Sequence, residues 1–181
     1  MSLYQDVTMA GFGGQGIMLI GNLLAYAGME SGYNVTFSPV YGPEMRGGTA
    51  HCTVVISDEE IGSPIITRPK ATIIMNQPSL DKFQPRLENG GVQVLNASLV
   101  DVALAEKDRI RTVAVAANDI ADKLGNARMA NMVALGAYIR ATAVLTIDAV
   151  IASLPNVIGE HYAHLLPKNA HALRAGFDAA S

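Results

Sequence analysis

The residues best suited to chemistry near the start of the chain are a cluster of glycines. The segment Gly11-Phe12-Gly13-Gly14-Gln15-Gly16 satisfies the pattern G-x-G-x-x-G, with an apolar run (residues 7–10) before it and a helix-forming segment (residues 15–31) after it. Turns without side chains expose backbone N–H groups, and a helix N-terminus adds partial positive charge. In this strand–loop–helix context the pattern predicts a phosphate site, most familiar from Rossmann dinucleotide-binding folds.

A second requirement of a dinucleotide site is missing. NAD binding normally needs an acidic residue at the end of the second strand, where it holds the ribose hydroxyls. That strand end reads Phe37-Ser38-Pro39, without Asp or Glu, and the Arg that NADP would favour comes only at Arg46. The glycine loop is therefore expected either to bind an anion without a full dinucleotide or to serve tight packing alone.

The second candidate is the segment Tyr41-Gly42-Pro43-Glu44-Met45-Arg46-Gly47-Gly48. If the first two strands are parallel neighbours, the loops that follow them share the carboxyl edge of the sheet, where open α/β folds place ligands. Arg46 would then lie beside the backbone donors of Gly13 and Gly14. The alternative is a surface loop in which Glu44 and Arg46 simply form ion pairs.

Other reactive residues are weaker candidates. His161 and His164 lie one helical turn apart without a third ligand type nearby in the sequence, so we expect a solvated or packed pair and no metal site. Cys52 follows His51 within a strand pattern, where adjacent side chains point to opposite faces. These two cannot form a simple nucleophile–base pair, and a buried, inert thiol is expected at Cys52. We predict no catalytic residue in this chain.

These candidates need a scaffold, and the pattern predicts alternating strands and helices. Strands are expected at residues 7–10, 35–38, 50–57, 71–75, 92–96 and 112–116. Helices are expected at residues 15–31, just after 78, at 119–124, 127–142 and 147–154, and after 167, with Gly125-Asn126 as a C′ and N-cap pair. Buried strands that alternate with helices indicate one α/β domain over residues 1–181, a three-layer sandwich with a mostly parallel sheet and a Rossmann-like start.

Composition excludes several classes of protein. The chain has 13 basic and 16 acidic residues and a net charge of −3, which argues against nucleic acid as the main partner. Residues 7–29 carry no charge, but glycines interrupt them and the first basic residue is Arg46, so neither a signal peptide nor a membrane segment is expected. Cys52 is the only cysteine, which leaves no Cys₄ set for an iron–sulfur cluster and suits a reducing cytoplasm.

Several stretches together resemble the gamma subunit of the 2-oxoacid:ferredoxin oxidoreductases, a domain that is fused into one long chain in some pyruvate enzymes. The similarity runs nearly end to end. It is carried by residues 11–17, 41–50, 61–64, 75–83, 125–126 and 131–136. The sequence of residues 42–48 and 76–83 is more similar to that of 2-oxoglutarate or branched-chain oxoacid enzymes than to that of pyruvate enzymes.

The resemblance implies an enzyme of anaerobic metabolism that is active only as a complex. A 2-oxoacid, CoA and two oxidised ferredoxins would give acyl-CoA, CO₂ and two reduced ferredoxins. Thiamine diphosphate with Mg²⁺, and the iron–sulfur clusters, would belong to the alpha, beta and delta subunits. This chain would bind none of them alone, would support assembly and would help to accommodate CoA at Gly13, Gly14, Gln15 and Arg46. The competing hypotheses are a free-standing Rossmann-type NAD(P) oxidoreductase and a purely structural interaction module.

Overall fold

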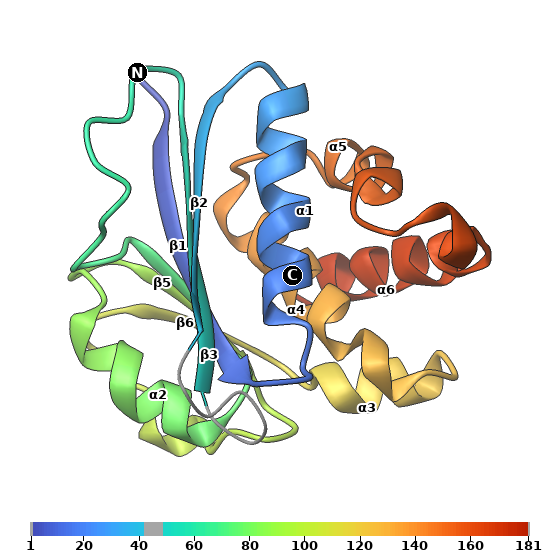
Figure 1. Ribbon diagram of the computed structural model, residues 1–181. Coiled ribbons are helices and arrows are strands. Elements are labelled where there is room, and N and C mark those ends of the chain that lie inside the picture. Colours follow the sequence, from blue (N-terminus) through green and yellow to red (C-terminus); the bar gives the residue numbers. More distant parts are fainter. Residues whose placement is uncertain (1, 42–48, 181) are drawn as a thin grey trace.

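A six-stranded sheet forms the centre of the computed structural model, which describes residues 2–41 and 49–180 (Figure 1). Its spatial order is β2-β3-β1-β4-β5-β6. The strands are β1 (Tyr4–Phe12), β2 (Asn34–Tyr41), β3 (Thr49–Ser57), β4 (Ala71–Ile74), β5 (Val92–Asn96) and β6 (Arg111–Val115). All six strands were predicted from the sequence, with boundaries that shift by no more than a few residues.

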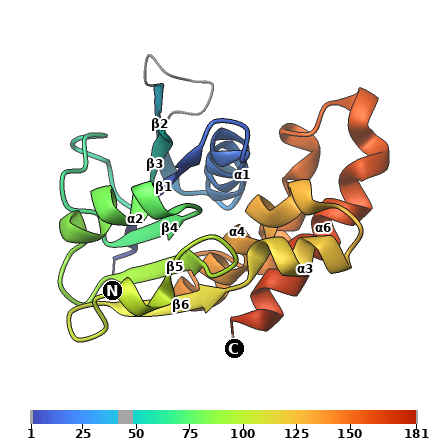
Figure 2. The ribbon, with the colours of Figure 1, turned by 90° about the horizontal axis from the view of Figure 1, so that it is seen from below.

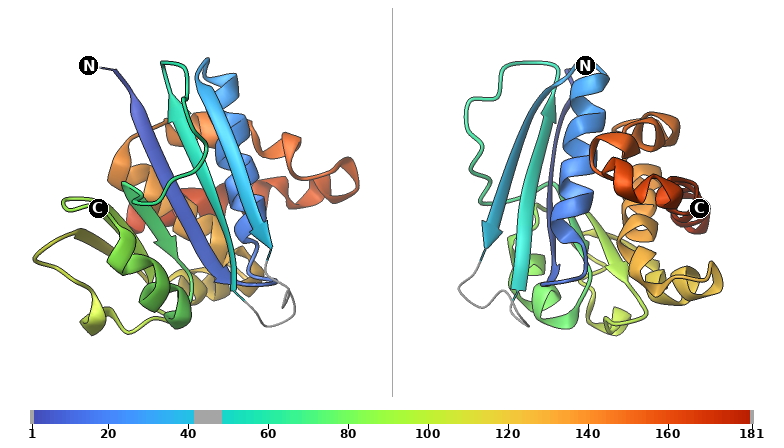
Figure 3. Two further views of the ribbon diagram at one scale, coloured as in Figure 1. Left: turned by 60° about the vertical axis from the view of Figure 1, so that its left-hand side comes forward. Right: turned by 45° about the vertical axis from the view of Figure 1, so that its right-hand side comes forward.

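Helices cover both faces of the sheet (Figure 3). One face carries α1, α3, α4, α5 and α6, whereas α2 lies on the other (Figures 1 and 2). The helices are α1 (Ile17–Glu30), α2 (Gln77–Phe83), α3 (Ala117–Lys123), α4 (Ala130–Thr142), α5 (Ile147–Ala152) and α6 (Leu166–Ala179). The predicted three-layer α/β sandwich is therefore confirmed.

Strand direction divides the sheet into two parts. The pairs β1–β4, β4–β5 and β5–β6 are parallel, as predicted, whereas β3 runs antiparallel to both β1 and β2. The expectation that the first two strands are neighbours is wrong, because β3 lies between them. Only seven residues separate β2 from β3, and a parallel neighbour would need a crossover of a dozen residues or more.

Helix α4 is buried over most of its length. Ten consecutive residues of α4, Ala130–Ile139, are buried, because the helix packs on the sheet and on α6 at once. A Cβ atom at Gly136 would lie 2.0 Å from the carbonyl oxygen of Leu173, and one at Gly176 would lie 1.8 Å from that of Val133. The two helices therefore approach closely enough that only glycine fits at these positions.

The start of α4 follows the predicted cap. Gly125 has a φ of +86°, and the side-chain oxygen of Asn126 accepts a hydrogen bond of 3.1 Å from the N–H of Arg128. A short 3₁₀ turn, Ala127–Met129, then leads into the α-helix. Within residues 2–41 and 49–180, no helix combines the length and apolar character needed to cross a bilayer.

Candidate functional site

The glycine loop is a tight turn between β1 and α1. The N–H of Gln15 donates to the carbonyl of Phe12 at 3.2 Å, and the N–H of Phe12 donates to the side-chain oxygen of Gln15 at 2.7 Å. Gly14 and Gly16 have φ angles of +91° and +73°, in the left-handed region that glycine adopts without strain. The predicted strand–loop–helix context is confirmed.

Packing explains two of the three glycines of the G-x-G-x-x-G pattern, Gly11 and Gly16. A Cβ atom at Gly11 would lie 2.9 Å from Ile17 and 3.0 Å from Met75, and one at Gly16 would lie 2.3 Å from the amide nitrogen of Asn131. Packing therefore requires these two glycines. By contrast, no atom beyond its chain neighbours lies within 4 Å of the corresponding position at Gly14, an exposed residue that lies at a variable position of the pattern.

Gln15 holds this turn in place. Its side-chain oxygen accepts from Phe12, and its amide nitrogen donates to the carbonyl of Met75 at 3.4 Å, which ties the loop to the end of β4. Both polar atoms of Gln15 are thus occupied. By contrast, the N–H groups of Gly13 and Gly14 donate to no other group within the described part of the chain.

A small cavity opens beside this turn. It has a volume of about 220 Å³ and is lined by Gly14, Gln15, Met75, Asn118, Ala127, Arg128 and Ala130. Its wall is fixed by Asn96 at the end of β5, whose amide donates to the side chain of Asn118 at 2.8 Å and whose oxygen accepts from the N–H of Ala117 at 3.2 Å. The cavity therefore lies at the carboxyl edge of the parallel strands, the expected place for a ligand.

Arg128 is the residue that sequence reasoning missed. It is exposed, lines the cavity together with Gly14, and forms no ion pair with any residue in the ranges 2–41 and 49–180. It reaches the glycine loop because Asn131, one turn later, donates to the carbonyl of Gly16 at 3.2 Å across 115 residues of sequence. The Gly125-Asn126 cap predicted the helix start, but nothing local indicated which loop the helix start would meet.

Arg46 lies outside the described residues, so its position beside Gly13 and Gly14 stays a prediction. The edge on which that prediction depends is present. Gly11 of β1 and Tyr41 of β2 both pair with Ala50 of β3, one from each side. Strands β1 and β2 therefore run in the same direction and end at the same edge, although β3 separates them.

His51 and Cys52 point to opposite faces of β3, as predicted. The Cys52 side chain is fully buried against α1, where its Sγ donates to the carbonyl of Ile17 at 3.7 Å. Burial raises the pKa of this thiol to about 12, so it stays protonated and unreactive near neutral pH. The His51 ring instead packs against Phe83 beside α2, with 4.9 Å between ring centres.

The remaining histidine pair stands apart from this edge. His161 and His164 are both exposed on a 3₁₀ turn, Glu160–Leu165, and the His161 ring makes an edge contact with Tyr162. No group of three or more His, Cys, Asp or Glu side chains that could hold a metal occurs within the described ranges.

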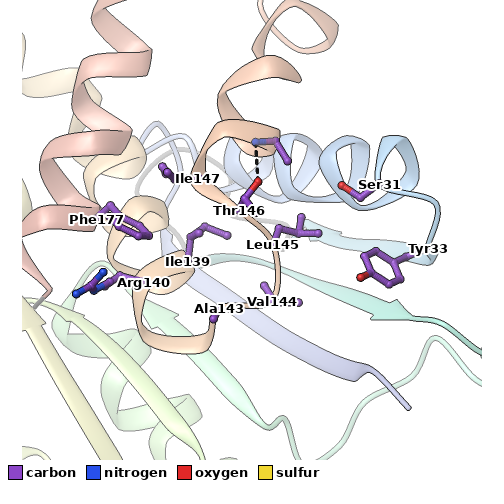
Figure 4. Close-up of a pocket in the computed structure, with 11 residues that line it drawn as sticks. Ser31, Tyr33, Ile139, Arg140, Ala143, Val144, Leu145, Thr146, Ile147 and Phe177 are labelled. Atoms are coloured by element: carbon purple, nitrogen blue, oxygen red, sulfur yellow. Dashed lines mark hydrogen bonds between the residues drawn. The ribbon is translucent and has the colours of Figure 1, made fainter. Parts of the chain in front are cut away.

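A larger cavity, of about 630 Å³, opens at the far end of α1 (Figure 4). Figure 4 shows Arg140 and Phe177 at one end of it and Ser31 and Tyr33 at the other. Its lining includes no carboxylate, histidine or thiol. The 14 residues of α1 place it about 20 Å from the glycine loop. We therefore take the smaller cavity as the candidate site.

The arrangement differs from that of a dinucleotide-binding fold. In such folds the second strand is a parallel neighbour of the first, and its end carries the acidic residue that holds the ribose. Here the neighbour of β1 on that side is the antiparallel β3, and β2 ends without an Asp or Glu. The glycine loop can receive a phosphate, but the expected ribose partner of NAD is absent from the strand that would carry it.

Comparison with known proteins indicates a single family. A family model described as pyruvate ferredoxin/flavodoxin oxidoreductase matches residues 6–179. The ketoisovalerate oxidoreductase subunit VorA of Methanothermobacter marburgensis is 42% identical over 130 residues, which are 72% of this chain. Because that stretch is 27% of VorA, the chain spans only about a quarter of this relative.

Two further matches extend over most of this chain and most of the matched protein. The 2-oxoglutarate synthase subunit KorC of the same organism is 32% identical over 160 residues, which cover 85% of this chain and 86% of KorC. The crystal structure of a keto/oxoacid ferredoxin oxidoreductase gamma subunit from Geobacter sulfurreducens superposes with a TM-score of 0.85. It shares 28% identity and covers 98% of this chain and 97% of its own.

Proposed function

Because this chain belongs to the pyruvate ferredoxin/flavodoxin oxidoreductase family, we propose that it is the non-redox gamma subunit of a 2-oxoacid:ferredoxin oxidoreductase. The complex would convert a 2-oxoacid, CoA and two oxidised ferredoxins to acyl-CoA, CO₂ and two reduced ferredoxins. The observation that carries this proposal is the family match over nearly the whole chain. The end-to-end similarity to a solved gamma subunit supports it.

The oxoacid is proposed to be 2-oxoglutarate or a branched-chain 2-oxoacid. The sequence of residues 42–48 and 76–83 favours these substrates over pyruvate. The names of the two relatives, a ketoisovalerate oxidoreductase subunit and a 2-oxoglutarate synthase subunit, are consistent with this choice.

The redox groups are proposed to reside on partner subunits of alpha, beta and delta type, in the cytoplasm, with ferredoxin reached through the complex. A Cys₄ cluster needs four thiolates, and this sequence has one cysteine, which is buried and protonated. The chain purified alone should therefore contain neither iron nor thiamine diphosphate and should not oxidise a 2-oxoacid. Stoichiometric iron or turnover without partners would contradict the proposed role.

Within the complex, the glycine loop is proposed to bind CoA phosphate. The N–H groups of Gly13 and Gly14 would donate to it, Gln15 would keep the turn in shape, and Arg46 and Arg128 would supply charge. The support is the small cavity beside Gly14, the helix N-terminus behind it, and Arg128 at its rim, which has no ion-pair partner among residues 2–41 and 49–180. These residues would hold and orient CoA while the chemistry proceeds on the partner subunits.

Substitution of the two arginines tests this site in the assembled enzyme. Each charge-assisted hydrogen bond contributes roughly 1.5–3 kcal/mol, so Arg46→Ala or Arg128→Ala should raise the KM for CoA about ten- to a hundred-fold and leave the oxoacid KM unchanged. Arg46→Lys should recover only part of the loss, because a point charge does not replace a planar fork. Arg174→Ala, on α6 and paired with Asp148, is the control. Weaker assembly with unchanged CoA kinetics would show that Arg46 pairs across a subunit boundary instead.

The alternative, a free-standing NAD(P) oxidoreductase, would bind NADH or NADPH tightly, whereas the proposed subunit should bind them weakly. Without a ribose carboxylate, the Kd for NADH or NADPH should be on the order of millimolar or weaker, about 4 kcal/mol of binding free energy. Calorimetry on the isolated chain measures this directly. A micromolar Kd would favour the oxidoreductase and contradict the subunit proposal.

A further inference from the structure

A cluster of basic side chains surrounds Phe83, on the face of the sheet opposite α1. The His51 ring lies 4.9 Å from the Phe83 ring centre, the Lys82 ammonium 5.2 Å from it and the Arg86 guanidinium 5.7 Å from it. Phe83 is itself buried, so it serves as a fixed support for the three groups. We call His51, Lys82 and Arg86 the basic cluster.

Neither cation of the basic cluster is held in an ion pair within the described part of the chain. Lys82 and Arg86 are exposed, and neither takes part in the ion pairs found there. The adjacent carboxylate, Asp81, accepts a hydrogen bond from Gln77 at 3.2 Å. Burial, and after it the charges of Lys82 and Arg86, lower the pKa of His51.

The basic cluster lies at the same edge as the glycine loop. His51 pairs with Ala10 across the β1–β3 ladder, and Phe12, two residues further along β1, points to the same face. Phe12 keeps 38% of its surface exposed. Along β1, the exposed Phe12 therefore lies between Ala10, which pairs with His51, and the turn at Gly13 and Gly14. Along the strand, Ala10 and Phe12 are about 7 Å apart, a span comparable to one nucleoside.

We propose that the basic cluster binds the ribose 3′-phosphate of CoA, while the diphosphate of the same molecule lies at the glycine loop and Phe12 contacts the adenine. This inference rests on the proposed CoA site and adds a second anchoring point to it. CoA carries phosphate on two sides of a single ribose, which suits two anion sites that follow on either side of Phe12 along β1. Aromatic side chains stack on bases without requiring a particular hydrogen-bond pattern, and Arg and Lys are the usual partners of phosphate.

Dephospho-CoA, which lacks only the 3′-phosphate, isolates this contact in the assembled enzyme. The unsubstituted enzyme should have a lower KM for CoA than for dephospho-CoA. The double variant Lys82→Ala/Arg86→Ala should raise the KM for CoA about ten- to a hundred-fold, as expected for loss of charge-assisted bonds. The KM for dephospho-CoA should stay within about two-fold. Lys123→Ala/Lys168→Ala removes the same charge from exposed positions on α3 and α6 and should change neither value.

Other outcomes overturn the inference and are distinguishable from failure of the CoA site. An equal rise in the KM for CoA and in the KM for dephospho-CoA would mean that the basic cluster contacts a partner subunit. Dissociation of the variant complex on gel filtration would mean the same. If the double variant changes neither KM while Arg128→Ala raises both, the 3′-phosphate contact is wrong and the CoA site stands. If neither variant changes either KM, both proposals fail. A separate measurement on the isolated chain uses adenosine 3′,5′-bisphosphate, which should shift the His51 ring signals in NMR and leave those of His161 in place.

Discussion

At the α4–α6 contact, the Cβ atoms that Gly136 and Gly176 lack would lie only 2.0 and 1.8 Å from carbonyl oxygens of the facing helix. At the tip of the glycine loop, the corresponding position of Gly14 has no atom within 4 Å. The same residue type thus closes one region and keeps the other open. Glycine content alone therefore does not identify a ligand site, and only the surroundings of each glycine separate packing from binding.

The largest effect on stability should follow from adding a methyl group between α4 and α6. Gly176→Ala places a methyl group against a backbone carbonyl that cannot rotate away, so the helices must separate. We expect a loss of at least about 3 kcal/mol in the free energy of unfolding, measured by urea denaturation. Gly159→Ala is the matched control, because its φ of −59° suits alanine and no atom lies within 4 Å. Its stability should change by no more than about 1 kcal/mol. An equally small loss at Gly176 would refute the close approach.

An intermediate effect is expected inside the glycine loop itself. Gly16→Ala would meet the amide of Asn131 and would also require alanine at a φ of +73°. We expect a cost of about 1–3 kcal/mol in stability. In the double variant Gly16→Ala/Asn131→Ala the steric part should disappear, so its loss should be smaller than the sum of the two single losses. Strict additivity in the unfolding free energies would show that Asn131 does not limit space at Gly16.

The smallest effect on stability should come from protonation of His51. Because burial and the charges of Lys82 and Arg86 lower the pKa of His51 from its ordinary 6.5, the unfolded chain binds this proton more readily than the folded one. Stability should therefore fall as the pH drops through about 6.5, and the loss should level off below the lowered pKa. In His51→Gln this part of the pH dependence should vanish from thermal unfolding curves between pH 5 and 8. An unchanged slope would assign it to another group.

Much of the scaffold was predictable because its signals are local. The apolar runs before the glycine loop and at β4, β5 and β6, and the Gly125-Asn126 cap, depend on residues within a few positions of one another. The position of β3 was not predictable in this way. Its sequence reads as a strand in either direction, and only the short connection from β2 indicates that it turns back between β2 and β1.

Of the candidate site, the sequence allowed only the glycine loop to be recognised by its spacing. The glycine loop is recognisable from spacing, but the separation of Gly11 and Gly16 from Gly14 depends on Met75 and Asn131, which lie far along the chain. Arg128 and the basic cluster were missed for the same reason. Lys82 and Arg86 stand on either side of a helix end, and only the fold of residues 77–86 around Phe83 brings them together with His51.

Helix α1 is anchored by residues that the ribosome adds much later. The carbonyl of Gly16 at its start accepts from Asn131, and the carboxylate of Glu30 at its end accepts hydrogen bonds from Ser153 and Asn156. A nascent chain that has emerged only as far as β6 has the glycine motif but none of these anchors. The contacts that fix the two ends of α1 can therefore form only after residues 131–156 have been added. Until then, the glycine loop is held by Gln15 through Phe12 and Met75, while the helix behind it lacks both of its long-range contacts.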